Sequence, residues 1–269
     1  MNLAAEYDNR ALVPDHPRII LDWYADAKAY RESVRCELDI SYGAKVRNKC
    51  DLFFPSHEKS GAVVVFLHGG YWRSFDKSVF SHMAAGANAH GFTVAIPSYT
   101  LCPEVTIPEI IAELRQCCLF LGNRLGLPLV VAGHSAGGHL AACMAATGWS
   151  LLGARPDLVR SGMSVSGIFD LRPLMATPYN EDLRLNPVDA MTASPLFWPV
   201  PRKLAFDSWV GGAESFEFLR QARSLAAAWT GLGMASNYVA VPGENHFSVH
   251  AALANPESAM VRRLVDLAS

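Results

Sequence analysis

Residues 127–138, LPLVVAGHSAGG, decide the fold of this chain. The first half is a short apolar run rich in β-branched residues, which is typical of a buried strand. The second half has the pattern Gly-x-Ser-x-Gly and predicts a sharp turn from that strand into a helix, with Ser135 at the tip. The serine backbone is expected near the left-handed region, where side chains two positions away on either side collide unless they are very small. Gly133 and Gly137 meet that requirement.

The composition of the 269 residues predicts one large domain, 1–269. The chain is 51% hydrophobic and 18% charged, which supplies a large core and argues against disorder. Its formal net charge is −2 without a block of like charges, so nucleic acid and anionic membranes are not expected as partners. No apolar stretch approaches the roughly 18 residues of a bilayer-spanning helix. Residues 1–8 lack the basic and apolar regions of a secretory leader, so we expect a cytoplasmic protein.

The six cysteines do not form a recognisable metal or redox motif. They are scattered through predicted strands and helices, and none is part of a C-x-x-C pair. We therefore expect buried free thiols rather than a zinc or redox site. The six are Cys36, Cys50, Cys102, Cys117, Cys118 and Cys143.

Apolar strands alternate with helical stretches along most of the chain. A hairpin is expected from strands 36–41 and 45–54, joined at Tyr42-Gly43. The further strands are expected at 62–67, 92–96, 129–132, 163–165, 204–209 and 237–241, and the helices at 17–33, 77–90, 106–125, 137–148, 215–230 and 256–268. This alternation predicts an α/β fold with a mostly parallel central sheet, helices on both faces and the hairpin as an antiparallel edge.

Residues 171–202 interrupt this rhythm with six prolines. The segment is too long and irregular for a plain connection between elements. It lies where a segment covering a substrate would be placed, so we interpret it as a small cap insertion.

A second motif, His68-Gly69-Gly70-Tyr71-Trp72, directly follows the strand at 62–67. Acyl transfer builds negative charge on a carbonyl oxygen, and fixed backbone N–H groups stabilise that charge. Glycines allow the carbonyl to approach the main chain closely. We expect the N–H groups of Gly69 and Gly70, together with that of Ala136 after the serine, to form an oxyanion hole. A plain Gly-Gly turn is the alternative.

A serine hydroxyl is a weak nucleophile at neutral pH and needs an adjacent base. On α/β folds that carry a serine at such a turn, the acid and then the histidine follow in the sequence. His246 lies in the turn after the last expected strand, where a loop at the edge of the sheet would hold a base. His250 is four residues further along, at the expected start of a helix, and is the competing candidate.

The acid has to hold one tautomer of the histidine and stabilise its charged form. Glu214 follows the strand at 204–209, at the end where catalytic groups of α/β sheets gather. It is also placed to interact with the N-terminus of the next helix, which is compatible with catalysis. Asp207, within the strand, and Asp170, after the preceding strand, are the competing acids.

Aromatic residues in the loops and in the cap are candidates for the walls of a pocket, although aromatic side chains more often belong to the core. The candidates are Tyr71, Trp72, Phe169, Trp198 and Phe247.

These motifs together resemble the α/β-hydrolase superfamily over nearly the whole chain. The H-G-G-Y-W motif, residues 99–104 (YTLCPE) and residues 133–138 (GHSAGG) are similar to those of hormone-sensitive-lipase-related esterases. Residues 166–171 (SGIFDL), 193–195 (ASP) and 210–215 (VGGAES) resemble the kynurenine formamidase branch.

The resemblance implies a serine hydrolase without metal or cofactor, in which Ser135 is the nucleophile, His246 the base and Glu214 the acid. The acid departs from the pattern, because relatives more often carry Asp there. The implied reaction is hydrolysis of a small aryl formamide such as N-formylkynurenine through an acyl-enzyme. A carboxylesterase of short-chain or aryl esters is the alternative, and a non-catalytic ligand-binding protein on this scaffold is the alternative of another class. The expected partner is a small amide or ester, and a homodimer is the candidate assembly.

Overall fold

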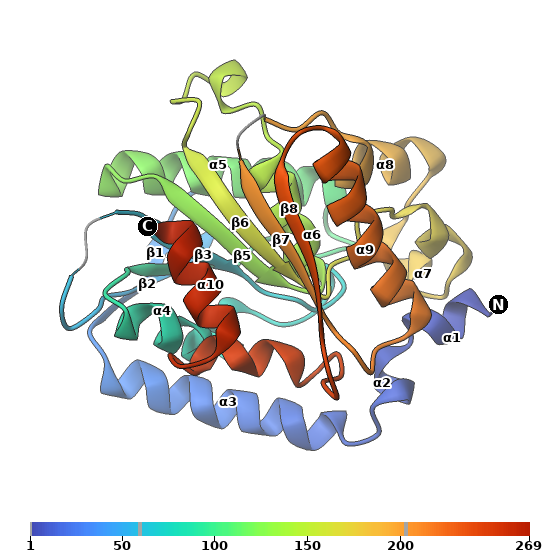
Figure 1. Cartoon of the computed structure of the whole chain (residues 1–269), viewed down its shortest axis with the longest axis horizontal. Helices are drawn as coiled ribbons and strands as arrows, with labels where there is room; N and C mark the ends of the chain where they lie inside the picture. The colour runs from blue at the N-terminus through green and yellow to red at the C-terminus, as the bar shows by residue number, and fades with distance from the viewer. Residues whose placement is uncertain (1, 59–60, 202–203) are drawn as a thin grey trace.

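The computed structural model describes residues 2–58, 61–201 and 204–269. At its centre is a sheet of eight strands in the order β1-β2-β4-β3-β5-β6-β7-β8 (Figure 1). The β1–β2 and β2–β4 pairs are antiparallel and the other pairs are parallel. This confirms the predicted mostly parallel sheet with an antiparallel N-terminal edge. The strands are β1 (Cys36–Ser41), β2 (Lys49–Phe53), β3 (Val63–Leu67), β4 (Val94–Pro97), β5 (Leu129–His134), β6 (Val159–Val165), β7 (Ala205–Gly211) and β8 (Ala235–Val241).

The central strands are apolar on both faces because helices cover both. In β3, Val63 and Val65 pack into one hydrophobic cluster with α5, α6 and α9, while Val64 and Phe66 pack into another with α3, α4 and α10. Alternate residues of a strand point to opposite faces, which explains why β3 is a continuous apolar run. The helices are α1 (Leu3–Tyr7), α2 (Asn9–Leu12), α3 (His16–Ser33), α4 (Ala85–Ala89), α5 (Ile107–Leu125), α6 (Ala136–Ala145), α7 (Asn180–Leu183), α8 (Pro187–Thr192), α9 (Phe216–Gly231) and α10 (Ala259–Ala268).

The hairpin between β1 and β2 has a longer connection than the sequence indicates. The second strand begins at Lys49 rather than at residue 45. Asn48 closes the loop, since its carbonyl accepts a hydrogen bond from Tyr42 N–H at 3.0 Å and its Oδ1 accepts one from Lys45 N–H at 3.1 Å. The side chain of Asn48 thus replaces the two-residue turn expected at Tyr42-Gly43.

The helix expected at 77–90 is broken into two 3₁₀ turns, Lys77–Val79 and Ser81–Ala84, followed by α4. Phe80 stands between the turns with φ −119° and ψ 14°, outside helical geometry. Its buried ring packs against Trp23 of α3 at a centroid distance of 5.5 Å. Tertiary packing of this aromatic side chain therefore overrides the helical pattern.

Two short helices, α1 and α2, precede α3, although the sequence pattern indicated none there. Tyr7 fixes them to the domain. Its side chain is fully buried, its hydroxyl donates to Glu217 Oε2 of α9 at 2.7 Å, and its carbonyl accepts a hydrogen bond from the Tyr71 hydroxyl at 2.5 Å. The N-terminal residues are thus packed beside α9, distant in the sequence (Figure 1).

The segment interpreted as a cap, 171–202, forms two short helices, α7 and α8, and two 3₁₀ turns, Arg172–Ala176 and Pro195–Phe197. Its last residue, Arg202, lies outside the described residues.

Candidate active site

Ser135 stands at the tip of the turn between β5 and α6, with φ 56° and ψ −120°. This backbone requires its neighbours to be small. A Cβ on Gly133 would lie 2.1 Å from the Gly137 carbonyl oxygen, and one on Gly137 would lie 1.9 Å from the Leu67 carbonyl oxygen. Real Cβ atoms do not come this close to backbone oxygens, so both positions need glycine. The turn presents the serine hydroxyl at the C-terminal end of the sheet.

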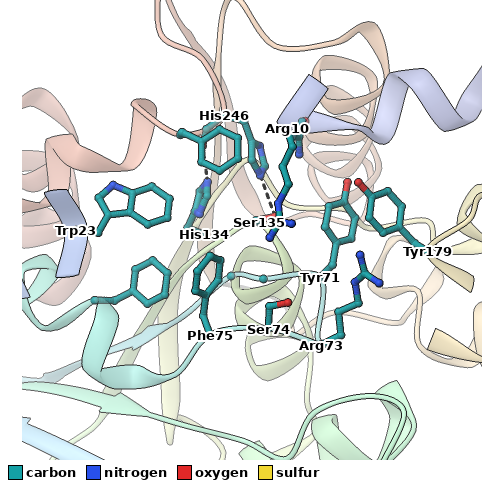
Figure 2. Close-up of a pocket in the computed structure, with 15 residues that line it drawn as sticks. Arg10, Trp23, Tyr71, Arg73, Ser74, Phe75, His134, Ser135, Tyr179 and His246 are labelled. Atoms are coloured by element: carbon teal, nitrogen blue, oxygen red, sulfur yellow. Dashed lines mark hydrogen bonds between the residues drawn. The ribbon is translucent and has the colours of Figure 1, made fainter. Parts of the chain in front are cut away.

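His246 and Glu214 form a hydrogen-bonded chain with this serine. The Nε2 atom of His246 lies 3.0 Å from Ser135 Oγ (Figure 2). Its Nδ1 atom lies 2.7 Å from Glu214 Oε2. A carboxylate only accepts hydrogen bonds, so the imidazole proton is on Nδ1 and Nε2 is free to accept the serine proton. Asn245 shapes the turn that carries the histidine, since its Oδ1 accepts hydrogen bonds from the N–H groups of Phe247 and Ser248.

The carboxylate of Glu214 is held from its other side as well. Its side chain is 1% exposed. Oε1 accepts hydrogen bonds from Gly211 N–H at 2.7 Å and from the Ser166 hydroxyl. Ser166 follows β6 directly and has φ 55°, and its role could not be read from the sequence pattern. These two donors fix the plane of the carboxylate that faces His246.

The competing candidates are engaged elsewhere. Asp170 accepts two hydrogen bonds from the side chain of Arg172 and one from its backbone N–H, and Asp207 is paired with Arg263 at 2.7 Å. His250 is buried and stacks on His134 with ring centroids 4.1 Å apart, rather than contacting Ser135. The structure therefore brings Glu214 and His246 to the serine and leaves the three alternatives outside the hydrogen-bonded chain.

His134 supports the loop that carries the base, although the sequence pattern did not single it out. Burial, together with the nearby His250 and His246, lowers the pKa of His134 well below its ordinary value, so the ring is neutral. Its Nε2 lies 2.9 Å from the His246 carbonyl oxygen and must carry the proton, since a carbonyl only accepts. His134 thus anchors the backbone of His246.

The loop after β3 comes close to Ser135. A Cβ on Gly69 would lie 3.0 Å from the His134 carbonyl oxygen and 3.1 Å from Ser135 Cβ, and Gly70 has a φ of +115° that favours glycine. Among the described residues, none accepts a backbone hydrogen bond from the N–H groups of Gly69, Gly70 or Ala136. Free main-chain donors next to a nucleophile are what an oxyanion hole requires.

A cavity opens over Ser135 and His246. It contains about 590 Å³ of empty space, a figure that includes the open solvent at its mouth. Of the predicted pocket residues, Tyr71 and Phe247 line it. Further lining residues that the sequence pattern did not identify are Asn9, Arg10, Trp23, Arg73, Ser74, Phe75, Phe80 and Tyr179.

The other three predicted pocket residues lie elsewhere. Trp72 is fully buried, with its Nε1–H 3.2 Å from His139 Nδ1, and Phe169 is fully buried in the core. Trp198 donates from Nε1 to the Thr192 carbonyl, away from the cavity. All three residues lie in loops or in the segment interpreted as a cap, which is why the sequence predicts them near the site. In the structure, their side chains pack against other parts of the domain instead.

The walls of the cavity come partly from the predicted cap and partly from the N-terminus. From the cap segment, Tyr179 stacks on Tyr71 with ring centroids 4.1 Å apart and an interplanar angle of 9°. Helix α2 contributes Asn9 and Arg10. Both segments cover the same side of the nucleophile (Figure 2).

The described residues contain no group of three or more His, Cys, Asp or Glu side chains arranged to hold a metal ion. None of their helices combines the length and the apolar character needed to cross a bilayer.

Known proteins resemble this chain in sequence and in fold. The sequence model of the family described as BD-FAE matches residues 50–153. A candidate thioesterase from Silicibacter sp. TM1040 is 39% identical, with 98% of this chain and 99% of that protein covered and a TM-score of 0.90. Kynurenine formamidase of Danio rerio is 27% identical over 79% of this chain and 75% of its own length.

An esterase of the bacterial hormone-sensitive lipase family has a TM-score of 0.66 at 21% identity, covering 94% of this chain and 97% of its own, and shows a shared fold. The resemblance to these groups that the motifs predict is confirmed.

Proposed function

This chain belongs to the α/β-hydrolase superfamily, and we propose that it is a serine hydrolase that cleaves a small aryl formamide, such as N-formylkynurenine, through an acyl-enzyme. The observation that carries the proposal is the hydrogen-bonded chain from Ser135 Oγ to His246 and on to Glu214, at 3.0 and 2.7 Å. Nucleophile, base and orienting carboxylate are all within hydrogen-bond reach, which is the geometry that activates a serine.

The reaction follows from these positions. Ser135 Oγ attacks the carbonyl carbon while His246 Nε2 takes the hydroxyl proton, and the carbonyl oxygen becomes an oxyanion facing the N–H groups of Gly69, Gly70 and Ala136. The intermediate collapses when His246 donates its proton to the leaving nitrogen, which releases the amine and leaves an acyl ester on the serine. Water then attacks this ester with the same proton transfers, and the carboxylic acid departs.

Three features support a small aryl formamide as substrate. The relatives named kynurenine formamidases align over 79% of this chain. The cavity is lined by aromatic side chains, including Trp23 and Phe247, which can pack against an aryl group. A formyl group is the smallest acyl group and needs the least space beside Ser135, where the loop at Gly69 lies close.

Ester hydrolysis is the second candidate, because the relative that is 39% identical bears the name of a thioesterase. The two reactions use the same catalytic groups and differ in what the cavity accepts. Comparing kcat/KM for N-formylkynurenine and p-nitrophenyl acetate separates them. We expect measurable turnover of the formamide; its absence, with ester cleavage retained, would favour the esterase.

A non-catalytic binding protein on the same scaffold is a different class of function. Covalent labelling with a fluorophosphonate tests it, because the probe reacts with an activated serine. We expect labelling of the wild-type protein and none of Ser135→Ala. Loss of nearly all hydrolysis is expected for Ser135→Ala and His246→Ala, with a milder loss for Glu214→Ala because the acid orients the base. An unlabelled wild type would support the binding protein.

We also propose a reducing compartment such as the cytoplasm. All six cysteines are free thiols, and five of them are buried, which supports this location. A homodimer stays a prediction that size-exclusion chromatography with light scattering can test.

A further inference from the structure

The cavity over Ser135 carries positive charge that the protein does not neutralise. Its described lining contains two guanidinium groups, Arg10 and Arg73, and no Asp or Glu. Arg73 is paired with Asp182, which lies outside the lining. Arg10 forms no hydrogen bond or ion pair with any described residue. One cation beside the nucleophile is therefore available to a ligand.

The neighbouring residue, Asn9, adds an unused hydrogen-bond donor. Its side chain is 4% exposed, lines the same cavity, and its Nδ2 has no acceptor among the described residues. Burying an amide N–H without a partner costs free energy, and such groups are rare in folded proteins. An acceptor supplied by a ligand would satisfy it.

These two residues are held in place rather than frayed. Asn9 and Arg10 form the start of α2, directly after the buried Tyr7, which is hydrogen-bonded through its hydroxyl to α9 and through its carbonyl to Tyr71. The Asp8 side chain caps α2 by accepting from Ala11 N–H. The backbone that carries the Asn9 donor and the Arg10 cation is thus fixed at one wall of the cavity, which lowers the entropic cost of recognising a ligand there.

The cavity has two chemically different ends. Figure 2 shows Arg10, Tyr71, Tyr179 and Arg73 on one side of Ser135 and Trp23 on the other. The aromatic end is completed by Phe75, Phe80 and Phe247. A substrate whose carbonyl lies at Ser135 can therefore meet apolar rings at one end and fixed donors with positive charge at the other.

We propose that Asn9 and Arg10 form a subsite for a carboxylate of the substrate, so that the protein prefers aryl esters or amides that carry this anionic group. The Arg10 guanidinium supplies charge-assisted hydrogen bonds, and the Asn9 amide supplies a neutral one. The inference rests on the proposed hydrolase function, because it concerns the substrate of that same nucleophile.

A matched pair of substrates tests the subsite. 3-Acetoxybenzoate and 3-acetoxybenzamide share the scissile ester and the ring, and they differ in charge. We expect the wild-type protein to have a higher kcat/KM for the benzoate. Arg10→Gln should lower kcat/KM for the benzoate about tenfold, mainly through KM, because a hydrogen bond between charged groups at a partly exposed site is lost. The benzamide should stay within about twofold.

Two further variants sharpen the comparison. Asn9→Asp keeps the shape of the side chain and replaces the donor by a negative charge, so it should also lower turnover of the benzoate selectively. Arg18→Gln on the exposed face of α3 removes the same charge at a residue outside the cavity lining and should change kcat/KM for neither substrate. Equal kcat/KM for the two substrates in the wild type, or equal losses for both in Arg10→Gln, would overturn the subsite.

Binding of the two compounds to the Ser135→Ala variant tests the subsite independently of the proposed hydrolase function. Calorimetric titration with the two compounds measures their dissociation constants without turnover. Tighter binding of the benzoate that Arg10→Gln abolishes supports the subsite whether or not the ester is hydrolysed. Equal affinity overturns the subsite even when fluorophosphonate labels Ser135 and the hydrolase proposal stands.

Discussion

Replacing Glu214 by Gln changes one atom of the carboxylate and should disable the base rather than the fold. Glu214 Oε1 accepts from the Gly211 N–H, and Oε2 accepts from His246 Nδ1, both at 2.7 Å. The backbone donor cannot rotate, so the amide oxygen of a Gln must face Gly211. Its NH₂ group then faces Nδ1 and forces the imidazole proton onto Nε2. In that tautomer the histidine cannot accept the proton of Ser135.

The size of the effect follows from these contacts. If the Gln amide rotates so that its oxygen faces His246 Nδ1, the active tautomer is restored, but the amide NH₂ then faces the Gly211 N–H. Two donors would face each other there and a buried hydrogen bond would be lost, which costs about 1–3 kcal/mol. Losing the negative charge that stabilises the imidazolium costs about 1–2 kcal/mol more. Together about 2–5 kcal/mol, at one factor of ten per 1.36 kcal/mol, predict that kcat falls about 30- to 5,000-fold.

The assay is steady-state hydrolysis of p-nitrophenyl acetate at pH 7.5, with the urea unfolding midpoint measured on the same preparation. Asp170→Asn is the matched control, because Asp170 is the competing acid and its carboxylate binds Arg172 instead. The control should keep kcat within about twofold. A Glu214→Gln protein with kcat within fivefold of the wild type would refute the assignment of this carboxylate, and so would a large loss in the control.

Three further predictions test the surroundings of the site. Gly69→Ala keeps the backbone N–H but adds a Cβ that would lie 3.1 Å from Ser135 Cβ, so the loop or the serine must shift. This displacement of the expected oxyanion donor should lower kcat by up to about 100-fold without unfolding, and an unchanged kcat would contradict it. Arg263→Ala leaves Asp207 buried without its cation and should lower the free energy of unfolding by about 1–3 kcal/mol in urea titrations, with kcat per folded molecule unchanged. Burial lowers the pKa of His250 to about 3 in the folded protein. Between pH about 6.5 and 3, this histidine is therefore protonated in the unfolded chain and neutral in the folded protein. The free energy of unfolding should then fall as the pH decreases from about 6.5 towards 3, by up to about 1.4 kcal/mol per pH unit from this group, and equal urea midpoints at pH 7.5 and 5.0 would argue against it.

The sequence by itself determined the features that depend on near neighbours along the chain. The glycines around Ser135 are required by contacts within the same strand–turn–helix unit and with the adjacent strand. The alternation of apolar strands and helices predicted the parallel sheet, because a strand that is buried on both faces is a nearly continuous run of hydrophobic residues. The positions of Glu214 and His246 followed from the rule that the loops at one edge of such a sheet meet.

Only the tertiary structure decided the walls of the cavity. Trp72 and Phe169 are buried in the core rather than in the cavity, and the direction of a side chain depends on packing that the motif does not encode. Ser166 reaches Glu214 from another strand, and its partner could not be found by spacing. Asn9 reaches the cavity because Tyr7 docks against a helix that lies more than two hundred positions along the chain. Local sterics therefore place Ser135 at the tip of its turn, whereas contacts between remote segments shape the cavity above it.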